Sequence, residues 1–113
     1  MGWILGKHNS GYLEMLLAKG KSWSVYLLKY PINSYIPDHI DLLTEGEELH
    51  RINFVLKRAK RGGVFYYGDV NDSAKFTKTR FTRFRPDLDR HGVTEVEKGS
   101  RYVLSIGWKQ PHI

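Results

Sequence analysis

Residues 91–108 read HGVTEVEKGSRYVLSIGW, and this stretch decides the fold. Two runs rich in valine, isoleucine and aromatic residues, 91–96 and 101–108, are separated by Lys98, Gly99 and Ser100. Runs of this composition that are bounded by turn-forming residues are typical of antiparallel strands. We therefore expect a hairpin that brings Arg101 back beside the strand that carries His91.

The same pattern of composition extends from residue 23 to residue 108. Short runs rich in valine, tyrosine, phenylalanine, threonine and isoleucine alternate with turn residues, and they predict further strands at 22–30, 37–43, 50–58, 62–67 and 79–85. A flat sheet of this many short strands would expose one face and both edges. The sequence therefore predicts a mainly all-β fold, a jelly-roll sandwich or double-stranded β-helix.

Two finer predictions concern packing. Residues 11–17, GYLEMLL, are helix-forming and end shortly before Gly20, so we expect a short N-terminal helix. The larger apolar residues of the predicted strands are expected to form the sandwich core: Trp23, Phe54, Val55, Val103, Leu104, Ile106 and Trp108.

Length and composition limit the class of protein. A chain of 113 residues is expected to be a single domain, 1–113, with its motif-bearing core at about 23–109. No apolar run is long enough to span a bilayer, and the N-terminus lacks the apolar core of a secretory signal, so we expect a cytoplasmic protein without membrane contact. The absence of cysteine excludes disulfides, thiolate zinc sites and a cysteine nucleophile.

The net charge of +6 favours an acidic partner. Basic residues gather in 57–61 and 75–90, and the second run is interleaved with Phe76, Phe81 and Phe84. Such a pattern suits contact with a phosphate backbone and with bases, through Arg58, Arg61, Arg80 and Arg83. The alternative is that these runs are ordinary solvated strand faces with basic residues that protect an edge.

The segment His39-Ile40-Asp41 places two metal-ligating side chains at positions i and i+2, which lie on one face of a strand. A second histidine from elsewhere would complete a facial triad that leaves positions on Fe(II) open, and His91 is the best candidate. Alone, this pattern also fits a surface pair near a turn. His8, His50 and His112 show no ligand spacing.

Four segments at particular offsets give this motif its context. Tyr30 stands nine residues before His39, and the alternating run that begins at Arg51 precedes the double glycine 62–63. Residues 80–93 then lead to His91, and Arg101 follows ten residues later. Together these segments resemble the Fe(II)/2-oxoglutarate-dependent dioxygenases, and in particular their prolyl-4-hydroxylase-like branch.

The resemblance implies that His39, Asp41 and His91 hold Fe(II), that Arg101 and Tyr30 hold the co-substrate 2-oxoglutarate, and that O2 is consumed. It implies hydroxylation of a protein side chain or a nucleic acid, with release of succinate and CO2, and no catalytic residue beyond the metal centre. The family commonly has a longer helical region before the strands. Its absence here would leave a sheet face for another subunit to cover, so an oligomer is compatible with the sequence.

Two other functions fit the same fold. One is a catalytically silent jelly-roll module that binds nucleic acid or protein through its basic face. The other is a metal-binding jelly roll of the cupin type that carries out a different reaction, such as an isomerisation. This second alternative predicts additional histidine or glutamate ligands.

Overall fold

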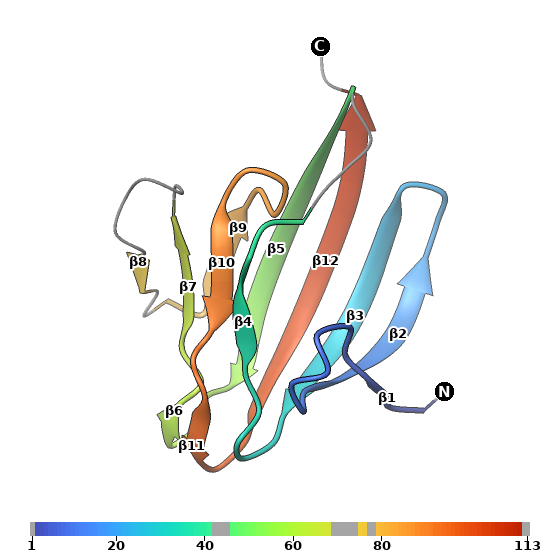
Figure 1. The fold of residues 1–113 in the computed structure, drawn as a ribbon. Helices are drawn as coiled ribbons and strands as arrows, with labels where there is room; N and C mark the ends of the chain where they lie inside the picture. Colours follow the sequence, from blue (N-terminus) through green and yellow to red (C-terminus); the bar gives the residue numbers. More distant parts are fainter. Residues whose placement is uncertain (1, 42–45, 69–74, 77–78, 112–113) are drawn as a thin grey trace.

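The computed structural model describes residues 2–41, 46–68, 75–76 and 79–111, and all regular structure in these ranges is β (Figure 1). The strands are β1 (Ile4–Leu5), β2 (Leu13–Lys19), β3 (Trp23–Tyr30), β4 (Ile36–His39), β5 (Glu47–Lys57), β6 (Arg61–Gly62), β7 (Phe65–Gly68), β8 (Lys75–Phe76), β9 (Phe81–Phe84), β10 (Arg90–Val93), β11 (Val96–Lys98) and β12 (Arg101–Pro111). None of these ranges contains a helix that could cross a membrane. Of the predicted strand 37–43, residues 42 and 43 lie outside the described residues, as does His112.

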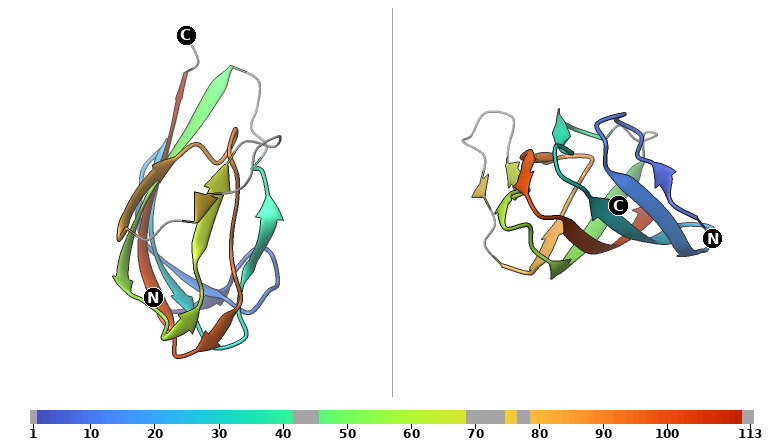
Figure 2. Two further views of the ribbon diagram at one scale, coloured as in Figure 1. Left: turned by 90° about the vertical axis from the view of Figure 1, so that its left-hand side faces the viewer. Right: turned by 90° about the horizontal axis from the view of Figure 1, so that it is seen from below.

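The strands form two facing antiparallel sheets. The large sheet has the order β1-β2-β3-β12-β5-β9, the small sheet has the order β4-β10-β7-β8, and β6 pairs with β11 as a separate ribbon. The side view in Figure 2 shows the two sheets face to face, with the ribbon closing one end. This is the predicted double-stranded β-helix. The predicted strands 22–30, 50–58, 79–85 and 101–108 correspond to β3, β5, β9 and β12, whereas the predicted strands 62–67 and 91–96 are each divided between two sheets, as β6 and β7 and as β10 and β11.

The core lies between the sheets. Its buried members are Tyr12, Tyr30, Phe65, Phe84, Val93, Val96 and Val103. Of the predicted core residues, Val103 is fully buried and Val55 packs against the cluster, whereas Trp23, Phe54 and Ile106 are exposed on the outer face of the large sheet. The prediction was wrong for these three because β3, β5 and β12 carry apolar side chains on both faces, and polar residues occupy part of the inner one.

The predicted N-terminal helix at 11–17 is wrong. Leu13–Lys19 instead form β2, which pairs antiparallel with β3 through a tight turn at Gly20, whose N–H donates to the carbonyl of Trp23 at 2.9 Å. Seven residues are too few for an independently stable helix, whereas the neighbouring strand offers a full set of backbone partners. Tertiary pairing therefore overrides the helix propensity of leucine and methionine.

The turn around Gly99 is present, with φ at +81°, but the strands on either side of it enter different sheets. β11 pairs with β6, while β12 runs between β3 and β5 in the large sheet. Arg101 therefore pairs with Tyr30 on β3. The expectation that Arg101 lies beside the strand that carries His91 was wrong. A long strand with apolar side chains on both faces is suited to this central position, where both of its edges are paired.

Candidate metal centre

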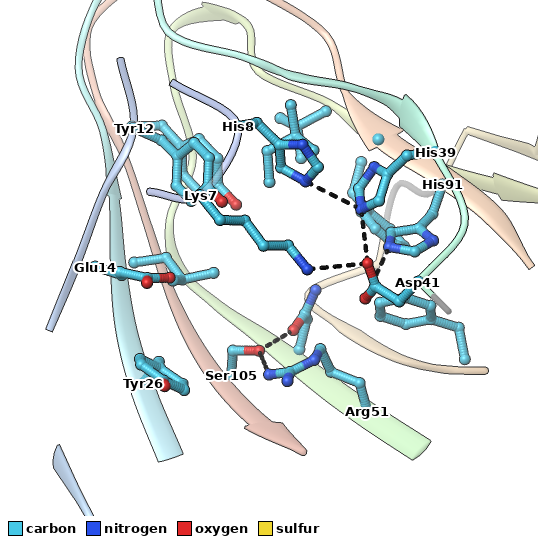
Figure 3. A pocket seen from close by; sticks show the side chains of 18 residues that line it. Lys7, His8, Tyr12, Glu14, Tyr26, His39, Asp41, Arg51, His91 and Ser105 are labelled. Carbon is cyan, nitrogen blue, oxygen red and sulfur yellow. Dashed lines mark hydrogen bonds and ion pairs between the residues drawn. The ribbon is translucent and has the colours of Figure 1, made fainter. Parts of the chain in front are cut away.

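The register of the small sheet brings two histidines together. His39 on β4 and His91 on β10 are cross-strand partners, and their ring centroids are 4.2 Å apart. Asp41 lies two residues after the end of β4, and its N–H donates to the carbonyl of Pro86 at 2.8 Å. One ligand atom from each of these three residues lies within 4.8 Å of the other two (Figure 3). The structure thus brings together the three ligands suggested by the sequence.

Hydrogen bonds to the backbone fix both imidazole rings. Nδ1 of His39 lies 2.8 Å from the carbonyl of Pro37, and Nδ1 of His91 lies 2.7 Å from the carbonyl of Asp89. Because a carbonyl only accepts, each Nδ1 must donate. The lone pair of a neutral ring is then on Nε2, which faces Asp41 in both residues. Metal-ligating histidines are usually oriented in this way.

The spacing of the ligand atoms fits one ion. Nε2 of His39 lies 3.2 Å from Oδ1 of Asp41, and Nε2 of His91 lies 3.9 Å from Oδ2. Two atoms bound cis at about 2.1 Å to one ion are about 3 Å apart, so the His39–Asp41 separation already matches and the His91–Asp41 separation must shorten by about 1 Å when an ion binds. Two nitrogen lone pairs and a carboxylate that face one another repel unless a cation, a proton or a metal, lies between them.

The ionisation of the three groups reflects this need for a cation. Burial opposes protonation of His39, but hydrogen bonds to Asp41 and to the Pro37 carbonyl raise its pKa above the ordinary value of 6.5. Burial likewise opposes ionisation of Asp41, but hydrogen bonds from His39 and Lys7 hold its pKa well below the usual range. Burial lowers the pKa of His91. The metal-free centre therefore retains an anionic Asp41, which is paired with Lys7.

The N-terminal segment supplies two further residues to the centre. Nζ of Lys7 lies 2.9 Å from Oδ1 of Asp41, and Nε2 of His8 lies 3.2 Å from Nε2 of His39. Nothing in the sequence around them indicates this position, because it depends on how the chain before β2 folds over the sandwich. Gly6 permits that path, since a Cβ there would overlap the ring of Tyr12.

A cavity of about 210 Å³ adjoins the three ligands. Its wall includes Tyr30, Phe65, Val93 and Arg51 as well as the metal ligands. This volume lies below the range of roughly 300–1,000 Å³ that is usual for drug-sized ligands, so the cavity suits a small molecule.

Arg101 lies beside this cavity rather than in its wall. Its side chain is buried, and the guanidinium stands over the ring of Tyr30 at 4.8 Å from the centroid. Arg101 lines a separate cavity of about 110 Å³, while Tyr30 lines the larger cavity and Phe65 lines both. No carboxylate of the described ranges is within ion-pair distance of Arg101.

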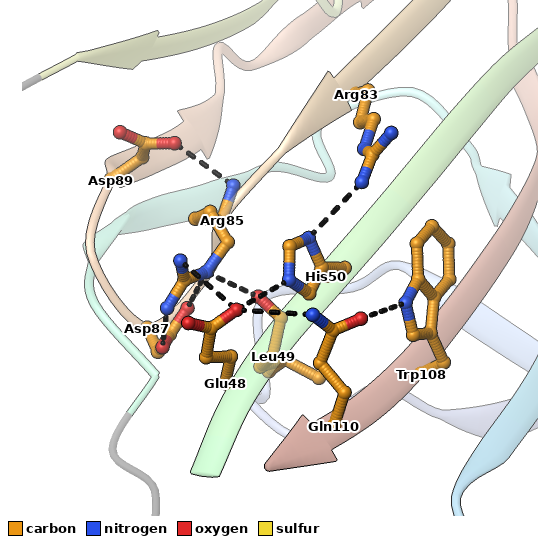
Figure 4. Close-up of polar contacts among 9 residues, drawn as sticks. All are labelled: Glu48, Leu49, His50, Arg83, Arg85, Asp87, Asp89, Trp108 and Gln110. Atoms are coloured by element: carbon orange, nitrogen blue, oxygen red, sulfur yellow. Dashed lines mark hydrogen bonds and ion pairs between the residues drawn. The ribbon is translucent and has the colours of Figure 1, made fainter. Parts of the chain in front are cut away.

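The four arginines proposed to contact nucleic acid lie elsewhere. All four are exposed, and none lines the cavity at the metal centre. Arg61 pairs with Glu97 at 3.8 Å, and Arg80 donates to the carbonyl of Val55 at 3.0 Å. Arg83 lies 5.4 Å from the ring centroid of Trp108, within the network of polar contacts in Figure 4. Arg58 lines the smaller cavity beside Arg101.

The comparison with family models finds no match, and the comparison with curated proteins finds none either. Solved structures do resemble the fold. A prolyl-4-hydroxylase from Pseudomonas putida aligns with a TM-score of 0.64 and 14% identity over 80% of this chain and 52% of its own. An oxidoreductase of the 2OG-Fe(II) oxygenase family from Burkholderia pseudomallei aligns with a TM-score of 0.64 and 17% identity over 82% of this chain and 48% of its own.

The cupin domain of Cnp3 from Schizosaccharomyces pombe is similar as well, with a TM-score of 0.60 and 13% identity over 88% of this chain and 65% of its own. The chain thus spans between about half and two thirds of the length of these three structures. At such identities the likeness shows the fold alone, a double-stranded β-helix of the cupin type. Proteins with this fold include oxygenases, a sugar phosphate isomerase and a transcriptional regulator.

Proposed function

We propose that the protein is an Fe(II)- and 2-oxoglutarate-dependent dioxygenase that hydroxylates its substrate with release of succinate and CO2. The observation that carries the proposal is the pair of facing histidines, His39 and His91, each with Nδ1 bound to a carbonyl and Nε2 directed at Asp41. Two nitrogens and one carboxylate form the ligand set of the facial triad, which suits Fe(II).

The co-substrate would lie in the cavity of about 210 Å³. In this proposal the far carboxylate is held by Tyr30, which lines this cavity, and by Arg101, which lines the smaller cavity, so the Tyr30 ring must move aside for the guanidinium to reach the carboxylate. A buried guanidinium without a carboxylate partner favours an anion and binds carboxylates in a bidentate manner. Fe(II), when bound, supplies the activation of O2 that is coupled to oxidation of 2-oxoglutarate.

The chain's own residues would orient the metal ligands and shield the centre from water. The backbone carbonyls of Pro37 and Asp89 keep the two imidazole rings in the orientation that a metal needs. Phe65 and Val93 form an apolar wall that limits the access of water to the centre. The cytoplasm remains the expected location.

A second candidate function has one specific observation in its favour. Nε2 of His8 is 3.2 Å from Nε2 of His39, which is the separation of two cis ligands on one ion. A centre with three histidines and one carboxylate would match the cupin-type alternative with a different reaction. The three-ligand set is preferred because His8 does not belong to the group whose ligand atoms all lie within 4.8 Å of one another.

The test is anaerobic addition of Fe(II) and then 2-oxoglutarate to the metal-free protein, followed by visible spectroscopy. The proposal predicts a weak charge-transfer band that His39→Ala abolishes and His50→Ala, a histidine outside the centre, retains. If Fe(II) binds but 2-oxoglutarate produces no band and no protection of the iron from chelators, the oxygenase function is wrong. A difference between the Co(II) spectra of His8→Ala and the wild type would then support the four-ligand centre.

A further inference from the structure

A second cavity, of about 390 Å³, opens beside the metal centre. Lys7, Asp41 and Arg51 line both cavities, so the second begins where the first ends. A molecule whose reactive part lies at the metal can therefore extend its remaining part into this space.

The wall of the second cavity is strongly basic. It contains Lys7, Lys19, Lys21, Arg51 and Lys109. The one carboxylate among the described residues that line it is Asp41, which is paired with Lys7 and also belongs to the metal centre. Several like charges around one cavity repel one another, and an anionic ligand relieves that repulsion.

The lysines are held by the backbone of paired strands. Lys19 ends β2, and Lys21 lies in the tight turn where Gly20 N–H donates to the Trp23 carbonyl at 2.9 Å. Lys109 lies on β12, and its N–H donates to the carbonyl of Ser22 at 2.7 Å. Three lysines from two segments far apart in the sequence thus face the same cavity.

Arg51 marks the junction of the two cavities and is fixed by inward-facing groups. Its Nη1 donates to Oγ of Ser105 at 2.7 Å, and Ser105 in turn donates to Oδ1 of Asn53 at 2.7 Å (Figure 3). The guanidinium lies over Gly107, where a Cβ would come within 2.5 Å of Nη2. Burial lowers the pKa of Arg51. Across the described part of the chain, no carboxylate is close enough to form an ion pair with it.

We propose that this basic cavity binds a phosphate group of the prime substrate, so that the substrate is a phosphate-bearing molecule. The inference rests on the proposed function for the chemistry at the metal, but the binding site itself does not depend on it. A phosphate places up to two negative charges and three acceptor oxygens in a small volume, which matches several lysines and a guanidinium better than one carboxylate does. Two sources share this chemistry, a small phosphorylated compound and a single nucleic-acid strand.

The test measures binding of a fluorescent single-stranded oligothymidylate to the full chain by anisotropy, with Zn(II) at the centre and without 2-oxoglutarate. The triple variant K19Q/K21Q/K109Q should weaken binding at least tenfold and make the slope of log affinity against log salt less steep by about 2. The matched triple variant K29Q/K57Q/K98Q removes the same charge away from the cavity and should change affinity less than threefold. Thermal melting verifies that both variants are folded.

Competing ligands distinguish the two sources of the phosphate group. Displacement only by unlabelled oligonucleotide indicates a nucleic-acid strand, whereas equal displacement by pyrophosphate at the same molar concentration indicates a small phosphorylated compound; both support a phosphate site. Equally tight binding of polyglutamate, equal losses in the two triple variants, or no binding of oligonucleotide or pyrophosphate would overturn it. Failure of the charge-transfer test with phosphate binding intact would reject the oxygenase and retain this site.

Discussion

The ammonium of Lys7 lies 2.9 Å from Oδ1 of Asp41, the same oxygen that Nε2 of His39 approaches at 3.2 Å. A side chain from the N-terminal segment thus supplies positive charge to the carboxylate of the candidate metal centre. Lys7 is 62% exposed, so solvent screens the pair, and its net contribution is at most about 1 kcal/mol.

Lys7 and a metal ion compete for this carboxylate. Lys7→Met should therefore raise the affinity for Co(II) by about two- to fivefold, since the variant removes a competing cation and keeps the aliphatic stem. Competition with a chromophoric chelator measures the affinity. Lys29→Met is the control and should leave the affinity unchanged. A weaker affinity in Lys7→Met would mean that the lysine supports the metal-bound form.

The raised pKa of His39 predicts how metal binding depends on pH. A metal must displace the proton that His39 retains, so affinity should fall by on the order of tenfold for each unit that the pH drops below that pKa. In the metal-free protein the sign is opposite: this group stabilises the fold fully below pH 6.5, and the contribution is lost as the pH rises through the raised value. Zn(II) titrations between pH 6 and 8 test the first prediction, and thermal melting of the metal-free protein over the same range tests the second.

The cause of that shift can be tested in the metal-free protein. Asp41→Asn removes the carboxylate, and the pKa of His39 should then fall below its value in the wild type, as followed by NMR of the imidazole protons. His50, which lies outside the centre and pairs with Glu48, serves as the reference ring in the same spectra. An unchanged His39 would assign the shift to the Pro37 carbonyl instead.

Much of the fold could be predicted because strands and turns are local properties of the chain. The histidine pair could also be suggested, since the spacing of His39 and Asp41 and the position of His91 are visible in the sequence. It was harder to predict which side chains of a strand face the interior. Phe54 is exposed while Asn53 is buried beside Ser105, because a cavity between the sheets requires polar groups on part of the inner face. Alternation alone would place the apolar residue inside.

Lys7 and His8 could not have been assigned to the centre from the sequence. Their position depends on the path of the chain before β2, and no motif spacing describes it. Arg51 was visible only as the first residue of an apolar strand. Its role at the junction of two cavities follows from Gly107 on the neighbouring strand, whose missing side chain makes room for the guanidinium. Such cross-strand relationships arise from register, which the sequence does not specify locally.

Two arginines without carboxylate partners lead to separable predictions. Arg101→Ala should weaken 2-oxoglutarate binding at least tenfold while Zn(II) affinity stays within about twofold, because the residue is assigned to the far carboxylate. Arg51→Ala, which also removes a positive charge from the wall of the co-substrate cavity, should weaken 2-oxoglutarate binding less than Arg101→Ala does and should weaken oligonucleotide binding. Isothermal titration of the Zn(II) forms compares the two variants. The reverse pattern would assign the co-substrate to Arg51 and not to Arg101.

The alignment of the two histidines also depends on Gly92, the residue after His91. A Cβ at this position would lie 2.5 Å from Oη of Tyr66 and 2.8 Å from the backbone carbonyl of Ile36 on β4. Tyr66 can rotate away, but β4 must shift, and that shift would move His39 relative to His91. Gly92→Ala should therefore destabilise the fold by about 1–3 kcal/mol.

The same variant should lower Zn(II) affinity by about 10- to 100-fold, the usual effect of disturbing the support of metal ligands. Gly2→Ala, at a glycine with no heavy atom within 4 Å of the added Cβ, is the matched control and should change neither quantity. Adding Tyr66→Phe to Gly92→Ala removes the hydroxyl contact but not the contact with the Ile36 carbonyl. Partial recovery of stability without recovery of metal affinity would therefore locate the effect at the β4–β10 pair, whereas full recovery of both would assign it to Tyr66 alone.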